Sequence, residues 1–355
     1  MKVKRVVRSE YALLALLTLP AVLALLLNSG LPNTADGVLH VFRTFELDRA
    51  WRDMVWYPRI APDFAYGYGY PIFNYYAPLF YFAAEIFHAA GLNLEWAVKT
   101  VIVLTFYLYA LGMYLLARRW LRPAAAIAAA VAYVYTPYRF YEAFIQGDYP
   151  QFLALALVPF CLWAVTPLLA QANPHPNPPP PPRTRSRPSR TTRGTGEGED
   201  TPSSVEEVSE RGRLGWGSRY TFAFIAAYTA LLLAHNITAL IVTPLIGAYM
   251  VFLFALDAWH SLRSTAQPGP ERSRRPWLEP GRRLAMRAGR VVLAIGLSVG
   301  LAAFFWLPAL GEQKYVRIER LTRGFFDFRN YFLTKGALVG AGVGGAAGAI
   351  YDITR

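Results

Sequence analysis

The chain has 355 residues, of which 54% are hydrophobic and 15% aromatic, and its formal net charge is +13. Only 17% of the residues are charged, below the roughly 25% of an average soluble domain. The apolar residues form long, nearly charge-free blocks, which excludes a soluble globular protein. The basic residues concentrate in the loops between these blocks, which indicates membrane topology and argues against nucleic acid as a partner.

The sequence predicts an all-α polytopic membrane protein with about seven transmembrane helices. A helix that crosses a bilayer needs about 20 apolar residues, and aromatic ends extend the shorter blocks into the interface. The first block follows a basic start and lacks a small-residue cleavage site, so we expect an uncleaved signal anchor. The predicted spans are residues 11–27, 96–117, 123–137, 150–170, 220–234, 239–258 and 291–310.

Residues 71–91 are apolar but contain Glu85 and His88, so this block either crosses the membrane or lies at its interface. If it does not cross, the loops on the same side of the membrane as the N-terminus hold roughly twice as many lysines and arginines as the loops on the other side. If it crosses, the excess of basic residues moves to the other side. Positive loops favour the cytoplasm. We therefore expect interfacial helices in the first outer loop, a cytoplasmic N-terminus, and a multi-pass protein in contact with the lipids of the cell (plasma) membrane.

Composition divides the chain into four parts. An N-terminal membrane module covers residues 1–171 and includes an outer loop, 28–95. Residues 172–218 are rich in Pro, Arg, Ser and Glu, which predicts a disordered cytoplasmic linker because such a segment buries too little apolar area to offset its ordering entropy. A second membrane module covers 219–310, and an outer tail with a Gly/Ala-rich stretch covers 311–355.

The first outer loop contains the first candidate residues. Asp36 and His40 are four residues apart and share a face if a helix begins near Thr34. Taken alone, this position favours Asp36 as a residue that caps the helix or interacts with its dipole. Arg59 lies near the start of an aromatic run over residues 56–82. An arginine there suits lipid phosphate or a specific phosphate ligand, and the aromatic run suits either an interfacial belt or a platform for a carbohydrate or lipid head group.

Two further outer positions are polar within apolar surroundings. Glu142 and Asp148 flank a turn between two predicted spans, where carboxylates are costly unless they are solvated or paired. His235 and Asn236 interrupt an apolar run, either as a tight turn or as a polar site that faces the bundle interior. The histidines show no metal-ligand spacing and Cys161 is the single cysteine, so no metal or other cofactor is predicted, and a divalent metal has no supporting ligand motif.

Several strings resemble a group of bacterial membrane proteins labelled "6-pyruvoyl-tetrahydropterin synthase-related", which is similar to the YfhO-like proteins of the GT-C glycosyltransferase superfamily. These strings occur in order across most of residues 10–332 and are DGVLHVFR, YPRIAPDFAYGYGYPIFNYYAPLFY, RFYEAFIQGDYPQFLALALVPF, AHNITAL and FFWLPALGEQKYVRIERLTRGFFDFRNYF. The label is no guide to chemistry, because a pterin synthase is a soluble zinc enzyme with clustered histidines that this chain lacks.

The resemblance to GT-C enzymes implies transfer of a sugar from a polyprenyl-phosphate-type donor to an acceptor on the outer face. It implies Asp36 as the catalytic base, His40 as its support and Arg59 as the donor-phosphate ligand. It implies that three more residues line the same outward-facing cavity: Glu142, Asp148 and His235. The alternative is a non-enzymatic membrane protein of the same fold that handles envelope lipid or polymer.

The sequence departs from the GT-C pattern at two places. Gly37 follows Asp36 where many GT-C enzymes have an acidic pair. The resemblance also fades after Phe332, although family members usually continue into a sizeable outer region, so an incomplete chain without an acceptor-binding domain is one expectation.

Overall fold

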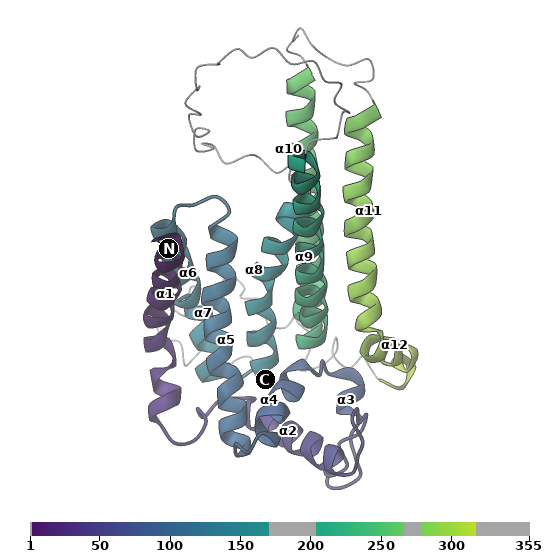
Figure 1. Cartoon of the computed structure of the whole chain (residues 1–355). Helices are drawn as coiled ribbons and strands as arrows, with labels where there is room; N and C mark the ends of the chain where they lie inside the picture. Colours follow the sequence, from purple (N-terminus) through teal and green to yellow (C-terminus); the bar gives the residue numbers. More distant parts are fainter. Residues whose placement is uncertain (1, 170–203, 266–277, 317–355) are drawn as a thin grey trace, which may run out of the picture. The chain divides into compact units, whose positions relative to one another are not determined.

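The computed structural model describes residues 2–169, 204–265 and 278–316. It divides into two compact units, Met1–Phe305 and Trp306–Arg355, which are treated separately. The prediction of an all-α protein is confirmed for the described residues, which form helices and no strand (Figure 1). One isolated β-bridge joins Ala61 and Tyr70.

The first unit contains the helices that position the site. In chain order they are α1 (Lys2–Leu27), α2 (Gly37–Arg52), α3 (Ile72–Tyr75), α4 (Leu79–Ala89), α5 (Leu94–Ala117), α6 (Pro123–Val134), α7 (Pro137–Tyr141), the π-helix η1 (Glu142–Gln146), α8 (Tyr149–Leu169), α9 (Ser204–Ala234), α10 (Asn236–Thr265) and α11 (Leu278–Leu301). The helix α12 (Ala303–Gly311) continues across the boundary between the units, and a 3₁₀ turn, η2 (Gln313–Tyr315), follows it.

Four described helical segments are long and apolar enough to cross a membrane. They are Ser9–Leu27, Leu94–Ala117, Tyr149–Leu169 and Asn236–Trp259, and a bent pair, Ala285–Leu301 with Ala303–Gly311, adds a fifth if it forms one span. The remaining two predicted spans correspond to shorter apolar helices, Pro123–Val134 and Arg219–Ala234. Length and composition therefore support four or five spans among the described residues, and the expected count of seven is not confirmed.

Helix α8 packs against α5, α9, α10 and α11, so it forms the centre of the first unit (Figure 1). Small side chains let the helices approach one another closely. A Cβ atom added at Gly112 of α5 would lie 2.7 Å from the ring of Phe160 in α8. Helix α6 packs against α5 and buries Ala126, Ala130 and Val134, which follow one another at a spacing of four and form one face.

The two ends of the segment predicted to be the first outer loop are hydrogen-bonded to each other. The backbone N–H of Gly30, just after α1, donates to Glu95 Oε1 at 2.6 Å, and Lys99 Nζ donates to the Asn28 carbonyl at 2.9 Å. Helix α4 has 11 residues, so it is about 16 Å long, roughly half of a hydrocarbon core. Among residues 71–91, therefore, no single described helix is long enough to cross a membrane by itself.

The predicted domain boundaries stay predictions. Helix α9 begins at Ser204, inside the stretch of 172–218 that composition assigns to a linker. The rest of that linker, the basic stretch 266–277 and the tail from residue 317 onward lie outside the described residues.

Candidate functional site

Asp36 stands directly before α2 but does not cap it. Its side chain makes no capping hydrogen bond; instead, Thr34 Oγ1 accepts the hydrogen bond from the Gly37 N–H at 3.0 Å. The Asp36 carboxylate accepts a hydrogen bond from Gln146 Nε2 at 2.7 Å. The carboxylate is half-buried, so it is held in place by a residue 110 positions away while one side remains accessible.

The turn that carries Asp36 is attached to the π-helix η1 through its backbone. The N–H groups of Ala35 and Asp36 donate to the carbonyls of Ile145 and Gln146 at 3.0 and 2.9 Å. Gly147 ends η1 in the left-handed conformation with φ 77°, and a Cβ atom there would lie 2.8 Å from the Gly37 nitrogen. A π-helical turn is often found at functional sites, and this one aligns the chain after α1 with the chain before α8.

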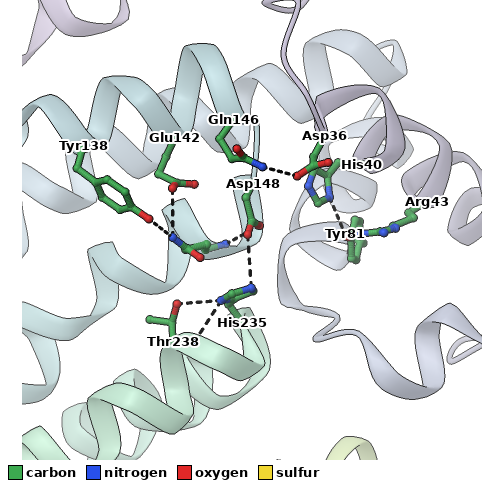
Figure 2. Close-up of polar contacts among 11 residues, drawn as sticks. Asp36, His40, Arg43, Tyr81, Tyr138, Glu142, Gln146, Asp148, His235 and Thr238 are labelled. Carbon is green, nitrogen blue, oxygen red and sulfur yellow. Dashed lines mark hydrogen bonds and ion pairs between the residues drawn. The ribbon is translucent and has the colours of Figure 1, made fainter. Parts of the chain in front are cut away.

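Asp148 and His235 form a pair at the starts of two apolar helices. Asp148 Oδ1 accepts from the Gln151 N–H at 3.2 Å, and its Oδ2 lies 3.5 Å from His235 Nε2 (Figure 2). The Thr238 N–H donates to His235 Nδ1 at 3.3 Å, so Nδ1 is an acceptor and a proton on Nε2 faces Asp148. Burial raises the pKa of Asp148 against the effect of His235, and burial lowers the pKa of His235 against the effect of Asp148.

Glu142 is buried and connects to this pair through Gln151. Gln151 Nε2 donates to Glu142 Oε1 at 3.2 Å and to the Tyr138 hydroxyl at 2.5 Å. Glu142 Oε2 is buried and has no hydrogen-bond partner among the described residues. Burial raises the pKa of this carboxyl, and the charges of Asp148 and Asp36 act in the same direction.

His40 is only 1% exposed and contacts an aromatic group rather than Asp36. Its Nδ1 lies 2.8 Å from the Tyr81 hydroxyl, which also accepts from Arg43 at 2.8 Å. Burial, assisted by the charges of Arg43 and His235, lowers the pKa of His40 to about 3. The imidazole is therefore neutral at physiological pH, and its hydrogen bond fixes the hydroxyl that holds Arg43 (Figure 2).

Arg43, which was not among the predicted residues, is the arginine whose charge reaches the carboxylates. Its guanidinium lies 4.2 Å from the centre of the Tyr76 ring, and its charge acts on Asp148. Arg59 lies exposed on the segment between α2 and α3. Burial raises the pKa of Tyr57 to about 12 although the charge of Arg59 opposes this effect.

The structure thus brings most of the expected residues together. Hydrogen bonds through Gln146 and Gln151, and the pairing of Asp148 with His235, join segments that are distant in the sequence. The residues in this group, here called the carboxylate cluster, are Asp36, Glu142, Gln146, Asp148, Gln151 and His235. In the described part of the chain, no group of three or more His, Cys, Asp or Glu residues is placed to hold a metal ion.

Comparison with known proteins gives one match. Residues 73–172 match a family model described as a 6-pyruvoyl-tetrahydropterin synthase related domain, membrane protein. The matched region runs from α3 to just past the end of α8 and contains Glu142 and Asp148. It supports the resemblance to that group over this stretch and a membrane location. No curated protein and no solved structure matches the chain.

Proposed function

We propose that this protein is an integral membrane transferase of the GT-C type, which moves a sugar from a polyprenyl-phosphate-type donor to an acceptor on the outer face of the cell membrane. One observation carries the proposal. The half-buried Asp36 carboxylate is released from capping by Thr34 and is held beside two further carboxylates by Gln146 and the turn after it.

In the proposed reaction Asp36 removes the proton from an acceptor hydroxyl. The acceptor oxygen then bonds to the anomeric carbon of the sugar, and the bond from that carbon to the donor phosphate oxygen breaks. The electron pair leaves on the phosphate, where a guanidinium stabilises the charge. Arg43 is placed for this role because a buried tyrosine hydroxyl and an aromatic ring hold it, whereas Arg59 lies on an exposed segment.

The proposal includes seven membrane crossings and a cytoplasmic N-terminus. The short helix α6 and the apolar part of α9, Arg219–Ala234, would complete the seven, with the bent pair Ala285–Leu301 and Ala303–Gly311 as the last crossing. The beginning of α5, the end of η1 and the beginning of α10 all contact the first outer loop, through Glu95, Gln146 and Asn236. An arrangement with all of these ends on one side of the membrane agrees with the basic loops on the other side.

A second candidate is a non-enzymatic protein that handles envelope lipid or polymer. It is favoured by the burial of His40 and Glu142, which are 1% and 2% exposed, because a buried polar network also stabilises a helix bundle without catalysis. An open pocket among the described residues also lies elsewhere, at the C-terminal end of α2.

Complementation of a deletion strain distinguishes the two candidates. Asp36→Asn keeps the shape of the side chain and a hydrogen-bond acceptor for Gln146 but removes the base, so lipid-linked glycans should lack the transferred sugar. Asp53→Asn is the matched control, since Asp53 is an exposed carboxylate at the other end of α2. An unchanged glycan profile in Asp36→Asn at wild-type expression would remove Asp36 from catalysis.

A further inference from the structure

An open pocket of about 750 Å³ lies beside the C-terminal end of α2, where α4 and the start of α5 meet it. Asp36 and Asp48 are 12 residues apart on or next to this helix, which places the pocket about 18 Å from the Asp36 turn. The pocket is thus separate from the carboxylate cluster. The lining residues that matter here are Asp48, Trp51, Arg52, Trp56, Glu85 and His88.

The ionisable side chains of the pocket balance in charge. Arg52 Nε donates to Asp48 Oδ1 at 2.9 Å, and His88 Nε2 lies 3.7 Å from the same oxygen. The acidic groups of the pocket are Asp48 and Glu85, and the basic groups are Arg52 and His88. The net charge is zero when all four are ionised, and it is also zero when Glu85 and His88 are both neutral. A pocket of this kind favours an uncharged polar ligand over an ion of either sign.

Glu85 lacks a hydrogen-bond donor that a ligand could supply. The residue is 2% exposed, and its Oε2 is buried with no partner among the described residues. A buried carboxyl oxygen without a partner is costly. Burial, together with the carboxylate of Asp48, raises the pKa of Glu85 to about 7, so the group can accept a hydrogen bond or donate one near physiological pH.

Two indole rings form the apolar wall. Trp51 and Trp56 have ring centroids 5.6 Å apart and planes inclined at 59°, and Trp51 Nε1 donates to the Trp56 carbonyl at 3.0 Å. Trp56 is 60% exposed although its position is fixed by this contact. An open aromatic face beside polar groups suits a ligand with one apolar face and several hydroxyl groups.

We propose that this pocket binds an uncharged saccharide, with the apolar face of a sugar ring against Trp56 and a sugar hydroxyl at Glu85. The Asp48–Arg52 pair supplies an acceptor and donors for further hydroxyls. A quaternary ammonium would also use the indoles, but it would face Arg52 and His88. This site does not depend on the transferase proposal, because binding requires no residue of the carboxylate cluster.

The test is binding of defined sugars to the full-length chain in detergent micelles. The probes are mannose, galactose, N-acetylglucosamine and maltose. Binding is measured by tryptophan fluorescence and by calorimetry at sugar concentrations up to about 10 mM, which is ten times a dissociation constant of about 1 mM. At least one probe should bind saturably. Trp56→Ala should weaken that binding about tenfold, as expected for loss of an aromatic contact, and Glu85→Ala should weaken it by a similar factor.

Trp120→Ala is the matched control, because Trp120 is also 60% exposed but lies in the short loop between α5 and α6. It should bind as the wild-type chain does. The proposal is overturned if none of the four sugars binds, if Trp56→Ala binds as tightly as Trp120→Ala, or if choline or glucuronate binds more tightly than every uncharged sugar.

Discussion

Replacement of Gly147 by alanine tests whether the turn that carries Asp36 depends on close packing against the end of η1. Gly147 has φ 77°, a conformation that costs a residue with a Cβ atom about 1–2 kcal/mol. The new Cβ would also lie 2.7 Å from Thr34 Cβ and 2.8 Å from the Gly37 nitrogen. Because the second contact is with backbone, the turn itself must shift, and overpacking of this kind costs about 1–3 kcal/mol more.

Gly67→Ala separates the two effects. Gly67 has φ 84° but a Cβ atom there would meet nothing within 4 Å, so only the backbone cost of about 1–2 kcal/mol applies. We expect Gly147→Ala to lower the free energy of unfolding by about 2–5 kcal/mol in total, clearly more than Gly67→Ala. Denaturant unfolding in detergent micelles, followed by tryptophan fluorescence, measures both variants under the same conditions.

Equal losses of stability in the two variants would refute the reasoning. They would mean that Thr34 and Gly37 move away from the added methyl group at no cost, and that the position of Asp36 is not fixed by this contact. A loss in Gly147→Ala that is larger than in Gly67→Ala would show that the closeness of the two turns contributes to stability.

Three further outcomes follow from the contacts. Lys99→Met should destabilise the chain by about 1–3 kcal/mol, measured by unfolding in micelles, because the ammonium group that holds the Asn28 carbonyl is lost; an unchanged midpoint would contradict this. Glu85 has a pKa of about 7 in the folded chain against an ordinary 4.5, so its contribution to stability is present below pH 4.5 and lost as the pH rises through 7. Glu85→Gln should therefore gain melting temperature relative to the wild type between pH 5 and pH 8, and a constant difference would disprove it. If Arg43 binds the donor phosphate, Arg43→Gln should raise the KM for a lipid-phosphate donor about 10–100-fold and Arg59→Gln should change it little. A larger effect of Arg59→Gln would show that Arg59 is the phosphate ligand.

Hydropathy was enough to predict the helical fold and the common location of most candidate residues. Asp36, Glu142, Asp148 and His235 each lie at or near the end of an apolar block, and helix ends on one side of a bundle meet. Hydropathy was not enough to predict the number of membrane spans. Residues 123–134 are rich in alanine and form a helix of only 12 residues, about 18 Å long.

The missed residues had weak or unused patterns. Arg43 follows Asp36 by seven positions and His40 by three, a helical spacing that was readable from the sequence. Gln146 and Gln151, which connect the carboxylates, have no such pattern, because a glutamine near a helix end has no preferred partner until the fold brings one close. The pocket beside Glu85 likewise depends on α2 and α4 meeting at distant positions in the chain.

The contacts of Gly30 with Glu95 and of Lys99 with Asn28 have a consequence for how the protein tolerates change. They fasten the two ends of a segment of more than sixty residues, so the helices on either side are held together whatever the length of chain between them. Lengthening such a closed segment costs little loop entropy. The segment that contains both the Asp36 turn and the Trp56 pocket is therefore a place where related proteins can acquire insertions and new specificities while α1 and α5 stay in register.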